Sequence, residues 1–147
     1  MLEHIKRLRD DTGASIAEIR SALEESGQDL AKAKELLRAK LGLLAGKKAS
    51  RAVRAGVVDA YVHSNGRIGA LVELHCETDF VARNPQFRAL AHDLAMHIAA
   101  MAPNDRDSLE AQEYIKEPAR NVRDVVAEAI GIFGENIKIG NFSRFEL

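Results

Sequence analysis

The segment from residue 56 to residue 76 constrains the fold most, because its pattern is typical of a β-hairpin. Asn65-Gly66 lies near its centre, and Asn-Gly strongly favours a hairpin turn because both residues tolerate a positive φ. In the second strand, alternate residues share an apolar face made of Ile68, Ala70, Val72 and Leu74. An apolar face must be covered, so we expect an antiparallel sheet with packed helices.

Two later segments have the apolar spacing of amphipathic helices. The first begins at Pro85, and its stripe consists of Phe87, Leu90, Ala91, Leu94, Ala95, Ile98 and Met101. The second is expected from Ala119 to about Ile130, and Gly131 and Gly134 should end it. These helices are candidates to cover the sheet.

The other segments of this half complete an α+β core. The polar stretch 104–118 predicts a loop with one helical turn. Ile137 and Ile139 start a last strand, and we expect a bulge at Gly140. Residues 56–147 are therefore predicted to form one α+β domain.

Residues 1–42 predict a separate domain of three short helices. Ser15 and Glu18 have the spacing of a capping box, in which each side chain bonds the backbone of the other residue. Apolar stripes mark the three helices, at Leu2, Ile5 and Leu8, then Ile16, Ile19, Ala22 and Leu23, then Leu30, Ala33, Leu36, Leu37 and Leu41. Residues 43–55, rich in Ala, Gly, Lys and Arg, predict a partly helical linker.

Composition and charge favour a cytoplasmic protein. The chain has 147 residues and a single cysteine, which excludes an internal disulfide and suits a reducing compartment. No apolar stretch approaches the roughly 18 residues of a membrane span. A basic cluster at Lys47, Lys48, Arg51 and Arg54 lacks interleaved aromatic residues, so a solvated face is favoured over RNA contact. We expect no direct nucleic acid partner and no membrane partner.

No combination of residues predicts an active site, a metal site or a cofactor. His75 and Cys76 are adjacent in a strand, so they point to opposite faces and cannot pair. His92 and His97 are five residues apart, unlike the pair four apart that chelates zinc on a helix. The acidic residues of the segment 73–79 lack the spacing of cation ligands. We therefore expect a protein that acts by binding and is not an enzyme.

The most informative candidate site is the run Thr78-Asp79-Phe80-Val81. It follows the second strand and precedes Asn84-Pro85, a favourable helix start, so it should form a turn between a strand and a helix. Binding residues often lie on such exposed connections. Phe80 beside an acid suggests a wedge for a partner. The alternative is that Phe80 folds back into the core, as most Phe side chains do.

Three separate segments resemble the bacterial elongation factor Ts family, the nucleotide-exchange factors of the GTPase elongation factor Tu. They are Leu8–Leu23, Glu73–Arg83 and the C-terminal part with Gly134–Ile137 and Arg144–Leu147. They occur in the family's order and cover nearly the whole chain. Two positions differ from the usual family residues, with Arg20 in place of Lys and His75 in place of Asn. Neither lies within the Thr78–Val81 turn.

The resemblance implies a fold, a function and a partner. Residues 1–42 would be a ubiquitin-associated-like domain, and the protein would be a guanine-nucleotide exchange factor that binds elongation factor Tu with GDP. The turn of Thr78, Asp79, Phe80 and Val81 would dock on the GTPase domain and disturb its magnesium and phosphate site. The N-terminal domain would give a second foothold, with matching positions at Leu8, Arg9, Ser15, Ile16 and Ala17.

The length of the chain suggests a short form of the family with a single core. Larger members carry two related core halves, and 147 residues leave room for one. Two chains could supply both halves, so the resemblance implies a homodimer formed through the 56–147 core. An alternative function is a non-catalytic ubiquitin-associated-like module that captures peptides or RNA. A weaker alternative is an enzyme that uses Cys76 as nucleophile.

Overall fold

The predicted hairpin forms two strands of a three-stranded antiparallel sheet. In the computed structural model, which describes residues 1–147, β1 (Ala55–Val62) pairs with β2 (Ile68–Cys76), and β5 (Lys138–Glu146) adds on the other side of β2. The turn is longer than a two-residue Asn-Gly loop. Gly66 has a positive φ of 67° and Asn65 does not, and the Asn65 side chain instead accepts a bond from the backbone N–H of Arg67.

A β-bulge interrupts the pairing of β2 with β5. Leu74 lies opposite Ile139 and Val72 lies opposite Phe142, so one residue of β2 faces two residues of β5. Gly140 is one of those two, which confirms the expected bulge. A bulge of this kind strengthens the local twist of a sheet.

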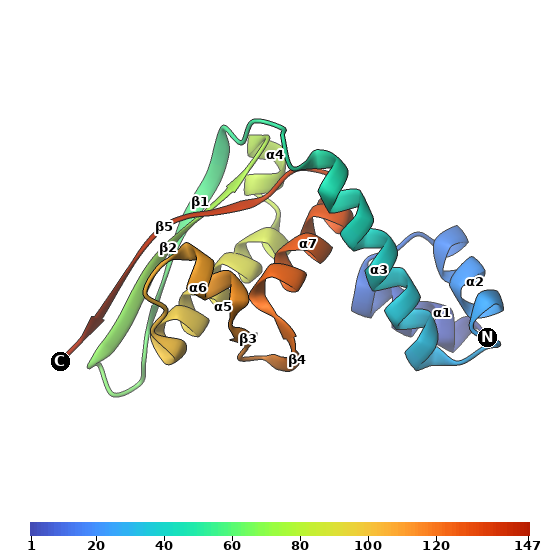
Figure 1. Ribbon diagram of the computed structural model, residues 1–147, viewed down its shortest axis with the longest axis horizontal. Coiled ribbons are helices and arrows are strands. Elements are labelled where there is room, and N and C mark those ends of the chain that lie inside the picture. The colour runs from blue at the N-terminus through green and yellow to red at the C-terminus, as the bar shows by residue number, and fades with distance from the viewer.

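Helix α5 (Pro85–Met101) covers one face of the sheet, as its apolar stripe predicts (Figure 1). Ala70, Val72, Leu74 and Cys76 of β2 are buried against it. Their neighbours in β2 are partly or fully exposed, which gives the alternation expected for a strand with one covered face. In Figure 1 no helix lies over the opposite face of the sheet.

The stretch predicted as a loop contains more structure than expected. Helix α6 (Arg106–Ala111) is followed by a small two-stranded ribbon of β3 (Glu113–Tyr114) and β4 (Glu117–Asn121). His97 of α5 is fully buried and anchors this region. Its Nε2 lies 2.9 Å from Gln112 Oε1, and its Nδ1 accepts the backbone N–H of Ile115 at 3.2 Å.

Helix α7 (Val122–Phe133) begins and ends later than predicted. Asn121 caps it by accepting the N–H of Asp124, and the helix passes through Gly131 to end at Gly134. Gly131 is therefore not a helix breaker. A Cβ at this position would lie 2.6 Å from Leu41 Cδ2, so glycine here permits close packing of α7 against the N-terminal part of the chain.

Three helices precede the sheet, as predicted: α1 (Leu2–Thr12), α2 (Ile16–Glu25) and α3 (Leu30–Lys48). The capping box at the start of α2 is present. Two residues of the predicted stripes lie on the surface, since Leu2 is 82% exposed and Ile16 is 43% exposed. The small core of this part consists of Ile5, Leu8, Ala14, Ile19, Ala22, Leu23, Ala33 and Leu37.

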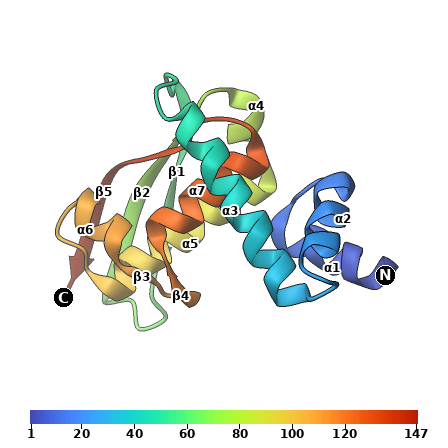
Figure 2. The same cartoon turned by 45° about the vertical axis from the view of Figure 1, so that its right-hand side comes forward.

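Helix α3 continues through the domain boundary predicted at residue 42. Its later turns pack against α7, and Ala45 belongs to the same buried cluster as the sheet. Arg38 of α3 also forms ion pairs with Glu117 and with Glu128 of α7. Figure 2 shows α3 lying across α7, with α1 and α2 beyond it. The α+β class is confirmed, whereas the domain division and the ubiquitin-associated-like character of residues 1–42 stay predictions. No helix combines the length and apolar character needed to cross a membrane.

Candidate partner-binding surface

The Thr78–Val81 run lies where the sheet meets the covering helix. Strand β2 ends two residues earlier, and α4 (Asp79–Ala82) is a single helical turn that leads into α5. Thr78 is the N-cap of α4, and its Oγ1 accepts the backbone N–H of Val81 at 3.4 Å. A threonine at this position satisfies one of the free N–H groups of the first helical turn.

Phe80 is 83% exposed, so the interpretation that it folds into the core is wrong. Its neighbours on α4 divide between surface and interior. Asp79 is exposed, whereas Val81 and Ala82 are each 5% exposed and pack in the main core. The turn is therefore fixed by one side while it presents an aromatic ring and a carboxylate on the other.

A carboxylate from a distant segment holds the start of this turn. Glu135 Oε1 accepts the backbone N–H groups of Glu77 and Thr78, each at 3.0 Å. Its Oε2 accepts the hydroxyl of Thr78 at 2.7 Å. Sequence reasoning singled out residues 134–137 as a family-like segment but did not predict this contact.

The contact between the two segments is reciprocal. Glu77 Oε2 accepts the backbone N–H of Asn136 at 2.6 Å. Asn136 is 1% exposed, and its side-chain amide donates to the carbonyls of Ala49 and Arg51 just beyond α3. The end of α3, the start of α4 and the start of β5 are thereby joined at one point.

Cys76 lies directly before this turn but has the environment of a structural residue. Its side chain is fully buried, and its thiol donates to the carbonyl of Thr78 at 3.2 Å. Burial raises the pKa of the Cys76 thiol, and the negative charge of Glu135 raises it further. A buried thiol with a raised pKa is a poor nucleophile, which argues against the enzyme alternative. No group of three or more His, Cys, Asp or Glu side chains is placed to hold a metal ion.

An open groove lies beside the acidic side of the turn. It has a volume of about 440 Å³ and is lined by residues 53–58 together with Glu73, His75 and Asp79. His75 Nε2 lies 3.5 Å from Glu73 Oε2. The groove extends the surface of the turn onto the sheet.

Comparison with known proteins identifies the family. The model of the family described as "Elongation factor TS" matches residues 77–147. The elongation factor Ts of Thermotoga neapolitana is 36% identical over 189 aligned positions, which cover 99% of this chain and 96% of the relative. The chain belongs to the elongation factor Ts family. The elongation factor Ts of Rubrobacter xylanophilus is 35% identical, with 99% of this chain and 98% of the relative covered.

The relatives of this elongation factor Ts family member differ in length. The alignment with the Thermotoga neapolitana protein has 189 positions against 147 residues here, so that relative contains segments that this chain lacks. The elongation factor Ts of Aquifex aeolicus is 41% identical over 150 positions, and this chain covers 52% of it. This chain of 147 residues is therefore shorter than both of these relatives. The part that matches the family model contains both the Thr78–Val81 turn and Glu135.

The N-terminal positions matched to the elongation factor Ts family divide between core and surface. Leu8 is 1% exposed and belongs to the small N-terminal core. Arg9, Ser15, Ile16 and Ala17 are exposed around the α1–α2 junction, where Ser15 caps α2. This junction lies beside the middle of α3, where Gly13 approaches the side chain of Ile132 of α7, whereas α4 lies beyond the C-terminal end of α3 (Figures 1 and 2). The two sets of candidate residues are therefore separate clusters.

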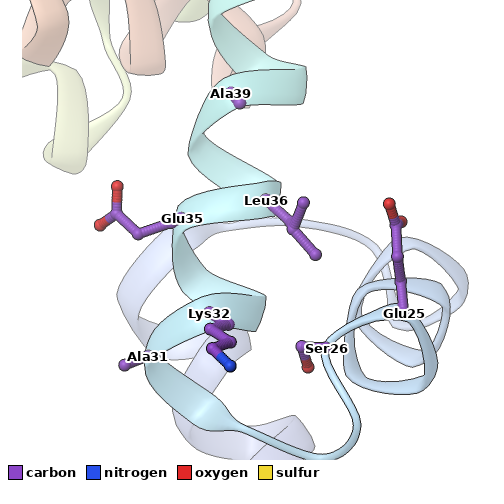
Figure 3. A pocket seen from close by; sticks show the side chains of 7 residues that line it. All are labelled: Glu25, Ser26, Ala31, Lys32, Glu35, Leu36 and Ala39. Carbon is purple, nitrogen blue, oxygen red and sulfur yellow. The ribbon is translucent and has the colours of Figure 1, made fainter.

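A second groove, of about 690 Å³, lies between the end of α2 and the first half of α3 in this elongation factor Ts family member. Leu36 and Lys32 point from α3 toward Ser26 (Figure 3). The lining consists of Glu25, Ser26, Ala31, Lys32, Glu35, Leu36 and Ala39. None of the nine residues proposed from the family resemblance lines this groove, so it contributes to neither candidate surface.

Proposed function

We propose that this protein is a guanine-nucleotide exchange factor that binds elongation factor Tu with GDP and promotes GDP release. The observation that carries the proposal is the 83% exposure of Phe80 on a capped and hydrogen-bonded turn, in a chain of the elongation factor Ts family. Aromatic anchors are frequent hot spots of interfaces, and a ring presented on a fixed backbone is already ordered for that role. The protein acts by binding and forms no covalent intermediate.

In the proposed mechanism the turn enters the GTPase domain and disturbs its magnesium and phosphate site. Burial of a Phe side chain contributes about 1.5–3 kcal/mol. Each tenfold change of an equilibrium constant needs about 1.4 kcal/mol, so Phe80 could weaken GDP binding by one to two orders of magnitude. Asp79 adds repulsion against a phosphate. The coupling is reciprocal, so GDP weakens binding of the factor by the same ratio.

The N-terminal helices supply the second foothold in this proposal. Arg9, Ser15, Ile16 and Ala17 offer an exposed surface with a positive charge and an apolar side chain, and Leu8 supports it from the core. Two footholds on one rigid body bind more tightly than either alone, because the second contact becomes intramolecular.

The proposed homodimer would use the uncovered face of the sheet. The large apolar side chains exposed on β1, β2 and the β5 end are Val58, Val62, Leu71, Phe145 and Leu147. Phe145 and Val62 both lie opposite Gly69 of the central strand, which leaves room for a ring from a second copy. Exposed apolar patches of this kind mark interaction sites. Light scattering should give twice the monomer mass of 16.1 kDa, and Phe145→Glu should give the monomer mass.

The test of the proposed function is the release of a fluorescent GDP analogue from purified elongation factor Tu in the presence of magnesium. We expect acceleration at substoichiometric amounts of this protein, because an exchange factor turns over. Deletion of residues 56–147 should abolish it, whereas binding of peptide or RNA that survives this deletion would favour the interaction-module alternative. No acceleration by folded protein at concentrations that allow dimerisation would refute the proposal.

A further inference from the structure

Helix α4 lacks the internal stability to fix its own geometry. It has four residues, one turn, and isolated helices of this length are not stable in water. Val81 and Ala82 pack in the core, but Phe80 is 83% exposed and gains little from contacts within the chain. The direction of the Phe80 ring therefore depends on how the backbone enters α4.

The carboxylate of Glu135 controls that entry. Its three accepted hydrogen bonds come from two consecutive backbone N–H groups, of Glu77 and Thr78, and from the Thr78 hydroxyl. Charged acceptors make stronger hydrogen bonds than neutral ones. No other side chain bonds both backbone N–H groups at the start of the turn.

The bond to the Thr78 hydroxyl carries the effect of Glu135 into α4. Because Thr78 gives its hydroxyl proton to Glu135, a lone pair of Oγ1 is left to accept the backbone N–H of Val81 at 3.4 Å. A hydroxyl free to rotate would hold this cap only part of the time. Glu135 thus fixes the rotamer of the cap residue Thr78. The cap in turn fixes the backbone at Val81, and with it the position of the preceding residue, Phe80.

The position of Glu135 is itself fixed. The N–H of its neighbour Asn136 donates to Glu77, and the Asn136 side chain bonds two carbonyls after α3. Helix α7 ends immediately before Glu135 with Gly134 in the left-handed conformation. The carboxylate therefore projects from a braced segment and does not swing with a mobile loop.

We infer that Glu135 is a positioning residue of the exchange turn, whose carboxylate holds Phe80 in its binding orientation before the partner arrives. This inference rests on the proposed exchange function. A turn held in advance does not lose conformational entropy on binding, which raises affinity without any new contact. If the competent conformation falls to about one-tenth of the population, the apparent affinity falls about tenfold.

The test is Glu135→Gln in the full chain. The amide keeps the size of the side chain but replaces one acceptor oxygen with a donor, so it cannot accept all three bonds. We expect the half-saturating concentration in GDP release to rise about tenfold, with the rate at saturation within about twofold of the unmodified protein. Asp105→Ala, which removes a cap of α6 remote from the turn, should leave both values unchanged. An unchanged half-saturating concentration for Glu135→Gln would overturn the inference.

A double-mutant cycle separates positioning from general stabilisation. In a Phe80→Ala background, Glu135→Gln should have no further effect on the half-saturating concentration, because there is no ring left to position. An equal effect in both backgrounds would show that Glu135 does not act through Phe80. If Glu135→Gln fails to fold, Thr78→Val removes the same hydroxyl relay and should give the same pattern.

Amide hydrogen exchange tests the positioning independently of activity. The hydrogen-bonded backbone N–H groups of Glu77, Thr78, Val81 and Ala82 should exchange faster in Glu135→Gln than in the unmodified protein, and those of α5 should not. If the unmodified protein does not accelerate GDP release, the proposed function fails, and the protection of these four N–H groups still decides whether Glu135 holds the turn. Equal protection in both proteins would refute the positioning role of Glu135.

Discussion

The replacement Phe80→Ala should separate function from stability, because Phe80 buries so little of its ring. An aromatic side chain has about 150–250 Å² to bury, and Phe80 is 83% exposed, so it buries on the order of 35 Å². At about 25 cal/mol per Å² this is worth less than about 1 kcal/mol of the free energy of unfolding. The variant should therefore fold and unfold almost as the unmodified protein does.

The matched control is Phe87→Ala, in the first turn of α5. Phe87 is fully buried, with its ring 5.9 Å from that of Phe133 in an edge-to-face arrangement. Removal of a buried Phe ring costs about 3–5 kcal/mol, because it leaves a cavity in addition to the lost burial. Urea denaturation of both variants should thus show a large difference between two Phe→Ala changes only seven residues apart.

Exchange activity should show the opposite order. If Phe80 is buried in the partner, its loss removes about 1.5–3 kcal/mol of binding. The rate of GDP release at subsaturating concentrations should then fall by about 10- to 150-fold for Phe80→Ala. Phe87→Ala, assayed at a temperature where it is folded, should retain activity. A destabilised Phe80→Ala would place the ring in the core, and full exchange activity in that variant would refute the wedge mechanism.

Three other features lead to testable expectations. Gly131→Ala should lower the thermal midpoint of unfolding. The clash of the new methyl group with Leu41 costs about 1–3 kcal/mol, which exceeds the gain of up to about 1 kcal/mol from the higher helix propensity of alanine. A higher midpoint would show that the two helices separate freely. Burial lowers the pKa of His97, so as the pH falls the unfolded chain takes up a proton at this residue before the folded protein does. The contribution of His97 to the free energy of unfolding should therefore be constant well above pH 6.5. Below pH 6.5 the free energy of unfolding should fall, by at most about 1.4 kcal/mol per pH unit. Urea denaturation between pH 5 and 8 measures this pH dependence. The same pH dependence in His97→Gln would show that another group causes it. Cys76 should resist alkylation in the native state and react in denaturant, and rapid native labelling would contradict its burial.

The elements that the sequence predicts correctly are those with a local signal. The alternation in β2, the stripe of α5 and the capping box of Ser15 with Glu18 each involve residues within a few positions of one another. The exposed location of the turn can also be predicted from the sequence, since a helix start follows the strand so closely. The exposure of Phe80 cannot be predicted in this way, because a local pattern does not distinguish a Phe that packs inward from one that faces solvent.

The features missed from the sequence depend on contacts between distant segments. Gly131 was expected to break α7, yet packing against Leu41 of α3 makes a helical glycine favourable there. The two-stranded ribbon after α6 is anchored by the bond from Ile115, in its turn, to the buried His97, which no local pattern reveals. The bonds of Glu135 to Thr78 join residues 57 positions apart, and the sequence offered only the family-like segment as a pointer.

The continuity of α3 makes the orientation of the N-terminal helices a matter of helical phase. Arg38 and Leu41 face the α7 side, and Lys48 at its end donates to the carbonyl of Gly134. A straight helix turns about 100° and advances about 1.5 Å per residue. One residue inserted in α3 before Arg38 would therefore rotate α1 and α2 around the helix axis by more than a quarter turn and shift them by only about 1.5 Å along it. The rotation would also remove Gly13 from its place beside Ile132 of α7. The number of residues in α3 therefore sets both the distance and the orientation of the N-terminal helices relative to the rest of the protein.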